Sequence, residues 1–212
     1  MRPDAAARPE FVTAFRELAG RIEQVLASTP KRNLPIKMFV AGGAAMHFYT
    51  GARVSEDVDA VFSRRIALPE NLEVAYRDAD GAARLLYFDR QYNDTLGLLH
   101  EDAQADSLPL SIDGIDPKIL DVRLLAPVDL AISKVGRFAE HDRGDITALA
   151  ARGLLDARSF RKRAEEAAIA YVGDTARLQS TIEMACRLIA DAQRRRDKPS
   201  NKNSAGKKRV RK

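Results

Sequence analysis

The first thirty residues carry apolar side chains at steps of three and four positions. The series consists of Phe11, Phe15, Leu18, Ile22 and Val25. Such spacing places the apolar side chains on one face of an amphipathic helix. We therefore predict a helix over residues 9–28, which ends where Pro30 follows.

Short apolar runs separated by turn residues fill the middle of the chain. They predict strands over residues 36–41, 57–62, 84–88, 95–99 and 120–125, with helices over 44–50 and 68–76 and a turn at 78–81. The later sequence returns to helical spacing. It predicts helices over 127–139 and 145–151 and then two long helices, for which Asp156 and Asp174 are the expected N-caps. The fold class is α/β, with a small mixed sheet flanked by helices and a helical C-terminal part.

The charge of the chain is unevenly distributed. Residues 194–212 hold ten Lys and Arg and one acid, which gives this segment a charge of +9. Because the formal net charge of the whole chain is +5, residues 1–193 carry −4. Because the tail has almost no apolar residues, we expect it to be disordered and to bind RNA or DNA through its charge, or to act as a solubilising tail without a specific partner. We predict three parts: an α/β domain over 1–155, helices over 156–193 and the basic tail over 194–212.

Composition excludes several classes of protein. The chain has one cysteine, Cys186, so it has no internal disulfide, and no apolar run approaches the length of a membrane span. There is no phosphate-binding Gly-x-x-x-x-Gly-Lys-Ser/Thr loop, and its three histidines lack zinc-like spacing. We expect a cytoplasmic protein that does not bind a membrane.

Two short motifs carry candidate chemistry. Gly42-Gly43 ends the apolar run of residues 36–41, and Asp57-Val58-Asp59 opens the next predicted strand. Since side chains alternate along a strand, Asp57 and Asp59 point the same way and repel each other unless a cation lies between them. Mg²⁺ accepts one or two carboxylates together with substrate phosphates, and adjacent glycines allow a backbone to approach a phosphate chain closely.

With these motifs and this spacing, the chain resembles the nucleotidyltransferase superfamily with the DNA polymerase β-like fold. The resemblance implies that Gly42 and Gly43 approach a nucleoside triphosphate and that Asp57 and Asp59 hold two Mg²⁺ ions. It also implies a third carboxylate on a neighbouring strand. We favour Asp102, because Leu98, His100 and Asp102 alternate on one face and would bring Asp102 out at the end of the strand predicted over 95–99. Asp121 and Asp94 are the alternatives.

A second segment is similar to the Lys-x-x-Arg … Arg-x-x-Asp motif of nucleotidyltransferase toxins from abortive-infection toxin–antitoxin pairs. It contains Lys134, Arg137, Arg143 and Asp145. In one unbroken helix Lys134, Arg137 and Asp145 would share a face, although Gly144 makes a break there plausible. Lys134 would bind triphosphate oxygens, with Arg137 beside it, and Asp145 would orient either cation. The chain departs from that subfamily in having Ser55-Glu56 where a threonine usually precedes the Asp-x-Asp motif.

These features predict a Mg²⁺-dependent enzyme that transfers a nucleoside monophosphate from a triphosphate to a hydroxyl. The acceptor is expected to be tRNA or another RNA, with a protein or a small molecule as alternatives, and the resemblance implies an antitoxin partner. The competing hypothesis is a catalytically degenerate nucleotidyltransferase-like module that binds RNA or a protein partner.

Overall fold

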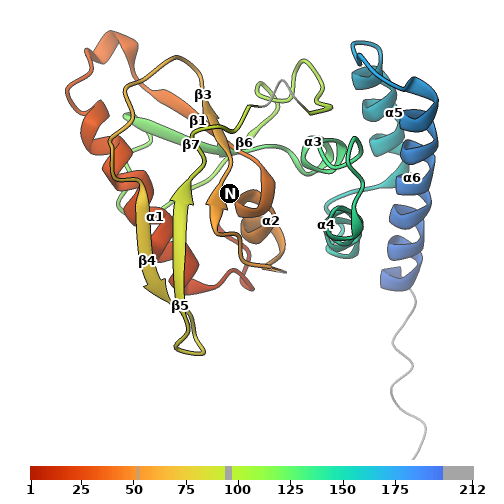
Figure 1. The fold of residues 1–212 in the computed structure, drawn as a ribbon, viewed down its shortest axis with the longest axis horizontal. Coiled ribbons are helices and arrows are strands. Elements are labelled where there is room, and N and C mark those ends of the chain that lie inside the picture. The colour runs from red at the N-terminus through yellow and green to blue at the C-terminus, as the bar shows by residue number, and fades with distance from the viewer. Residues whose placement is uncertain (52, 94–96, 198–212) are drawn as a thin grey trace, which may run out of the picture.

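A computed structural model describes residues 1–51, 53–93 and 97–197. In chain order the elements are α1 (Pro9–Leu26), η1 (Lys31–Asn33), β1 (Ile36–Val40), α2 (Gly42–Thr50), β2 (Asp57–Val58), β3 (Ala60–Phe62), β4 (Glu73–Arg77), β5 (Ala83–Phe88), β6 (Leu108–Pro109), β7 (Leu120–Leu124), α3 (Pro127–Ile132), α4 (Glu140–Ala151), α5 (Ala157–Ala168) and α6 (Thr175–Asp197). The strands lie in the first half of the molecule, and helices α3 to α6 form the second (Figure 1). This confirms the α/β class.

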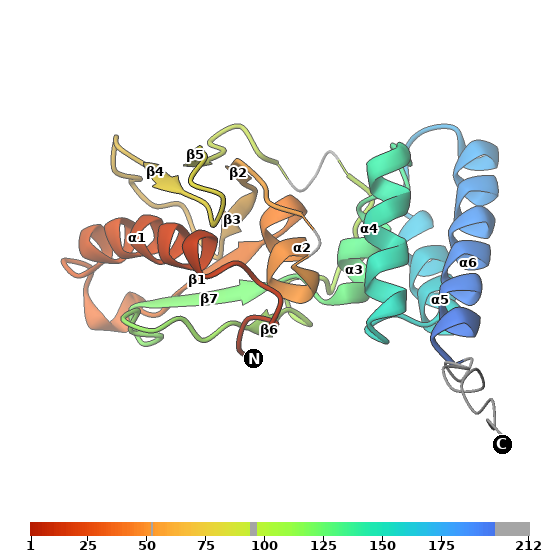
Figure 2. The same cartoon turned by 90° about the horizontal axis from the view of Figure 1, so that it is seen from below.

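Two small mixed sheets form the α/β part. One has the strand order β3-β1-β7-β6, with β1 parallel to β7 and antiparallel to β3. The other has the order β2-β5-β4, with β2 parallel to β5. Helix α1 lies along the second sheet and packs on β4 and β5 (Figure 2). Of its predicted apolar face, Phe11, Phe15, Leu18 and Ile22 are fully buried, whereas Val25 is 41% exposed.

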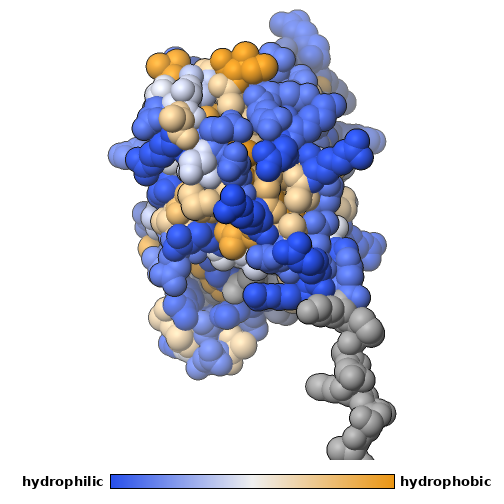
Figure 3. Space-filling view, turned by 90° about the vertical axis from the view of Figure 1, so that its right-hand side faces the viewer, coloured by the Kyte–Doolittle hydropathy of each residue, from blue (hydrophilic) through white to orange (hydrophobic). Residues whose placement is uncertain are grey.

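The C-terminal helices pack directly on the helices that follow the sheet. Helix α5 packs on α3, and α6 packs on α4 (Figure 2). A buried ion pair reinforces this contact, because the Arg163 guanidinium donates to both carboxylate oxygens of Asp129 at 3.0 Å. Their outer face is largely hydrophilic, with only scattered apolar side chains (Figure 3). The division at residue 155 stays a prediction.

Both predicted N-caps are present in the structure. A carboxylate oxygen of Asp156 accepts hydrogen bonds from the amides of Arg158 and Ser159, and one of Asp174 accepts from the amide of Arg177. Among the residues that the structure describes, no helix is both long and apolar enough to cross a membrane.

Several predicted elements were wrong in type or extent. Residues 73–77 form strand β4 rather than part of a helix over 68–76, and residues 97–99 are not a strand. The helix predicted over 127–139 ends at Ile132, and the next begins at Glu140, so Gly144 lies inside α4 rather than at a break. Helix α6 continues to Asp197, which makes residues 194–197 helical; residues 198–212 lie outside the described part.

The predicted strand over 57–62 is divided between the two sheets. Val58 is the last residue of β2, and its carbonyl accepts from the Asp89 amide that follows β5. The carbonyl of Asp59 instead accepts from the Ala41 amide that follows β1. Asp59 is therefore the residue at which the chain passes from one sheet to the other.

Candidate active site

The glycine pair lies where β1 passes into α2. Gly42 has φ +55°, a conformation that L side chains rarely adopt. A Cβ atom on Gly42 would lie 1.8 Å from Oδ2 of Asp59, and one on Gly43 would lie 2.2 Å from the Ser55 hydroxyl oxygen. The two glycines are therefore required by the close approach of the carboxylate-bearing segment.

Asp57 and Asp59 line the same side of the chain, as their alternation predicts, while Val58 between them is fully buried. The Ser55 hydroxyl donates to Oδ1 of Asp57 and so orients that carboxylate. Burial and the neighbouring charges of Asp57 and Asp89 together raise the pKa of Asp59 to about 6, against the opposing effects of Lys134 and Arg53. The site thus concentrates negative charge.

Lys134 supplies the facing positive charge. Its side chain is 6% exposed, and its Nζ lies 3.0 Å from Oδ2 of Asp145 and 4.0 Å from Oδ1 of Asp142. Arg53 approaches the same Asp145 carboxylate, with Nε 3.3 Å from Oδ1. Lys134 lies in the turn after α3 and Asp145 lies in α4, so tertiary packing, and not the shared helix face that we predicted, brings them together.

Arg137 has a different carboxylate partner from Lys134. Its guanidinium donates two hydrogen bonds to Asp142, from Nε at 2.8 Å and from Nη2 at 2.7 Å. Asp142 also accepts from the Ala139 amide at the start of α4. Burial raises the pKa of Asp142, but these hydrogen bonds outweigh it and hold the pKa below its ordinary value. The Arg137 side chain is nevertheless 65% exposed.

A cavity of about 520 Å³ unites these groups. Its lining includes Gly42, Asp57, Asp59, Lys134 and Arg137. The lining also contains two aromatic residues, Tyr92 and Tyr171, from segments that the sequence motifs do not cover. Five of the residues singled out from the sequence therefore meet around one hollow.

Asp102, which we favoured as the third carboxylate, does not line the cavity that Asp57 and Asp59 line. Asp102 lies in the turn over residues 101–106 with its side chain 61% exposed, and it lines a separate cavity beside α5. Asp121 pairs in register with Lys37 near the start of β1, whereas the glycines follow the other end of that strand, and its Oδ2 lies 3.1 Å from Arg123. Asp94 lies outside the described residues.

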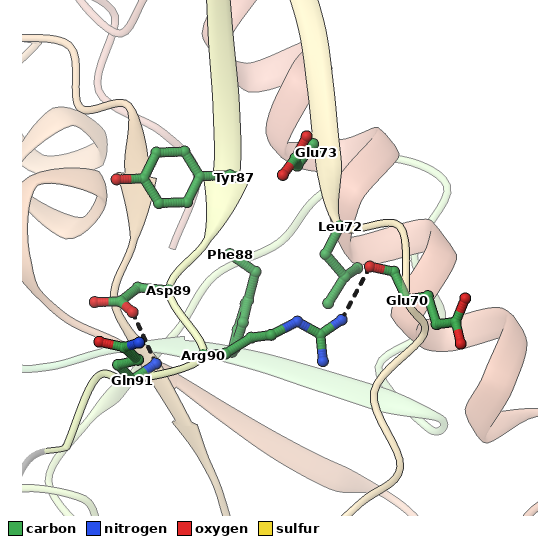
Figure 4. A pocket seen from close by; sticks show the side chains of 8 residues that line it. All are labelled: Glu70, Leu72, Glu73, Tyr87, Phe88, Asp89, Arg90 and Gln91. Atoms are coloured by element: carbon green, nitrogen blue, oxygen red, sulfur yellow. Dashed lines mark hydrogen bonds between the residues drawn. The ribbon is translucent and has the colours of Figure 1, made fainter.

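Asp89, which the sequence analysis did not select, lies beside Asp59, although it lines two neighbouring cavities and not the one that Asp57 and Asp59 line. It follows β5 directly, and its amide continues the parallel ladder with β2 next to Asp59. Its charge raises the pKa of Asp59. Tyr87 and Asp89 extend to the same side of β5 while Arg90 turns the other way (Figure 4). The sequence signal for Asp89 was a carboxylate directly after a predicted strand. It could not be used without knowing that β5 pairs with β2.

The donor set suits a hard cation completed by its substrate. Within the described ranges no three His, Cys, Asp or Glu side chains form a ready metal cage. Asp57 and Asp59 instead provide a half-buried, mutually repelling pair of carboxylates. This is the donor set that Mg²⁺ uses when phosphates and water supply its remaining ligands.

Comparison with known proteins places this arrangement in a family. Residues 14–192 match the model of a family described as a nucleotidyltransferase of unknown function (DUF6036). The chain belongs to this family. The match confirms the superfamily predicted from the Gly-Gly and Asp-x-Asp motifs, while the closeness to toxin-type members stays a prediction. Neither a curated protein nor a solved structure gave a significant match.

Proposed function

We propose that the protein is a Mg²⁺-dependent nucleotidyltransferase that moves a nucleoside monophosphate from a nucleoside triphosphate to an acceptor hydroxyl. One observation carries the proposal: the Gly42 turn, the Asp57–Asp59 pair and Lys134 line a single cavity. Family membership supports the same reaction class.

The start of α2 and Lys134 would bind the triphosphate. Ala41, the N-cap of α2, has no side-chain oxygen with which to cap the first amides of this helix, which suits them to a ligand. A helix N-terminus favours phosphate through these amides and its dipole. Lys134 adds a point charge that Asp145 holds in place at 3.0 Å. Arg137 would exchange one of its bonds to Asp142 for a phosphate oxygen.

The acceptor oxygen would attack the α-phosphorus while the bond from that phosphorus to the β-phosphate bridging oxygen breaks and pyrophosphate leaves. Asp89, beside Asp59, is the candidate base that takes the proton from the acceptor hydroxyl. Asp57 and Asp59 would hold Mg²⁺, which when bound supplies charge neutralisation at the reacting phosphate.

The decisive assay follows the label. The protein is incubated with each α-³²P-labelled triphosphate, Mg²⁺ and either total RNA or total protein. We expect label in one of these acceptors and none when the label is on the γ-phosphate. Asp57→Asn and Asp59→Asn should each abolish transfer while the fold is retained. Transfer by either variant, or in excess chelator, would exclude the proposed metal-dependent role.

The similarity of the segment around Lys134 to toxin-type enzymes supports RNA, tRNA included, as acceptor and supports an antitoxin partner. Expression of the wild-type chain should then arrest growth, and expression of Asp59→Asn should not. Equal arrest by both would separate toxicity from catalysis. Absence of both transfer and Mg²⁺-dependent triphosphate binding would favour the degenerate binding module.

A further inference from the structure

A second, smaller cavity adjoins the candidate active site. It has a volume of about 260 Å³ and shares Tyr92 with the site cavity, and Asp89 lines its wall. Three arginines, Arg64, Arg65 and Arg90, belong to the same lining. The sequence motifs gave no role to this place.

The cavity combines unpaired positive charge with an aromatic floor. Arg64 and Arg65 are exposed, and neither side chain makes an ion pair or hydrogen bond within the described part of the chain. Arg90 donates to the backbone carbonyls of Pro69 and Glu70, and no carboxylate among the described residues forms an ion pair with it. The half-buried Phe62 and the 6% exposed Phe88 belong to the same lining, and their rings stack at a centroid distance of 5.8 Å.

A neighbouring hollow, which shares Phe88, Asp89 and Arg90 with this cavity, has the opposite character. Glu70, Glu73 and Asp89 line it, and Arg90 is its one cation among the lining residues (Figure 4). A polyanion that approaches Asp89 is therefore repelled on that side and attracted on the side of Arg64 and Arg65.

We propose that this second cavity binds the end of a single-stranded nucleic acid and presents its terminal hydroxyl to Asp89. Arg64, Arg65 and Arg90 contact backbone phosphates, and the last base rests on the floor formed by Phe62 and Phe88. A basic rim over an aromatic floor suits a strand with both charge and stacking faces better than an acidic peptide, which has charge alone. The inference rests on the proposed function, because it names the acceptor of that reaction.

The proposed strand-binding cavity can be tested by measuring nucleic-acid binding under conditions that do not allow catalysis. A fluorescent twelve-nucleotide single strand, as RNA and as DNA, is titrated against the full-length protein over a range of salt concentrations, in chelator and without triphosphate. The double variant Arg64→Gln/Arg65→Gln is compared with Lys31→Gln/Arg32→Gln. The control pair loses the same charge from η1, whose residues do not line the second cavity.

We expect Arg64→Gln/Arg65→Gln alone to reduce the salt slope, by about 1.4 for two phosphates, and the affinity roughly 10- to 30-fold at 0.1 M salt. A 4-thiouridine at the 3′ end should crosslink to peptides that contain Phe62 or Phe88. Equal losses in both double variants, or crosslinks confined to residues 198–212, would overturn the proposal. So would tighter binding of a poly-glutamate peptide than of either strand. Because neither metal nor triphosphate is present, these outcomes are independent of whether Asp57 and Asp59 catalyse transfer.

Discussion

At the scale of single residues, the contact between Gly42 and Asp59 joins the two halves of the candidate site. The carboxylate occupies the space that a side chain at position 42 would need. A phosphate bound at the start of α2 and a cation bound by Asp59 would consequently be neighbours. The glycine thus sets the geometry of the carboxylate as well as access to the backbone.

Gly42→Ala should therefore damage both stability and activity. The added methyl group would lie 1.8 Å from Oδ2 of Asp59 at a φ of +55°, and the backbone conformation alone costs about 1–2 kcal/mol. We expect at least that loss in the free energy of unfolding and roughly 100-fold slower transfer, since small displacements at a reacting centre have such effects. Gly144→Ala is the matched control. It has open space inside α4 and should gain about 0.5–1 kcal/mol. Wild-type transfer by Gly42→Ala would contradict the geometry.

Asp59→Asn should stabilise the metal-free protein in a pH-dependent way. Burial and the charges of Asp57 and Asp89 raise the pKa of Asp59 from 3.8 to about 6, so the folded state holds this proton more tightly than the unfolded chain does. The stability that protonation contributes is complete below pH 4 and is lost as the pH rises through 6. Asparagine remains neutral, so its advantage should be small at pH 4 and reach a few degrees of Tm at pH 8, or about 1–2 kcal/mol after allowance for partial solvent contact.

Thermal melts in chelator from pH 4 to 8 measure this difference. Asp113→Asn is the comparison, because Asp113 is exposed and its side chain makes no hydrogen bond or ion pair to other described residues. Its Tm difference from the wild type should stay constant. A difference for Asp59→Asn that shrinks with rising pH would show that the carboxyl is stabilised in its charged form.

The sequence was sufficient to find Asp57, Asp59, Gly42, Gly43 and Lys134, and insufficient for Asp89. The first four lie in two short motifs whose spacing is visible along the chain. Asp89 approaches Asp59 only through the parallel pairing of β5 with β2, and β2 has just two residues. Asp102 was preferred because its alternation with His100 resembled a strand that does not form there.

At the scale of elements, the period of the apolar pattern decided which helices and strands could be predicted from the sequence. The long helices were predictable because their apolar residues recur over several turns. For residues 68–76 the apolar positions fit two periods at once. Leu72 and Val74 alternate with exposed Glu73 and Ala75, which is the period of a strand, and they are buried as β4 and its approach. The change of sheet at Asp59 left no mark in the pattern, because Val58 and Ala60 are buried in either case.

Helix α4 carries Asp145, which positions Lys134, the cation of the site. Removing the Asp145 carboxylate should destabilise the protein more than removing the Lys134 charge. Without the Asp145 carboxylate, Lys134 keeps only Asp142 at 4.0 Å; without Lys134, Asp145 keeps Arg53 at 3.3 Å. An uncompensated buried charge costs about 3–5 kcal/mol. We expect Asp145→Asn to lower the free energy of unfolding by about 2–4 kcal/mol, because Lys134 retains one distant partner, and Lys134→Met to lower it by less.

Urea unfolding of both variants provides the comparison, and slower transfer should accompany both. Glu165→Gln is the control, since it breaks an exposed pair with Arg161 on α5 and should change stability by less than about 0.5 kcal/mol. Equal losses for Asp145→Asn and Lys134→Met would mean that Arg53 does not compensate Asp145.

At the scale of the whole molecule, the separation of charge is the dominant property. Residues 198–212 contain Lys198, Lys202, Lys207, Lys208, Arg209, Arg211 and Lys212 and no acid. Three carboxylates of the body, those of Asp57, Asp59 and Asp89, lie at or beside the candidate site, where an anionic acceptor meets repulsion. A basic segment attached to such a body can raise the local concentration of nucleic acid without contributing to the chemical step.

Ending the chain at Asp197 should therefore weaken nucleic-acid binding while leaving the chemistry intact. This end point keeps all of α6, including Arg194–Arg196, which an end at Gln193 would remove. For a single-stranded RNA the log–log salt slope should fall by about 0.7 for each phosphate that the seven basic residues neutralise. The KM for the acceptor should rise, and kcat should stay within about twofold because Asp57, Asp59 and Lys134 remain. Replacing the seven residues by glutamine in the full-length chain should reproduce the effect, which assigns it to charge rather than length. An unchanged slope would mean that the tail does not touch the acceptor, and a collapse of kcat would mean that it enters the active site.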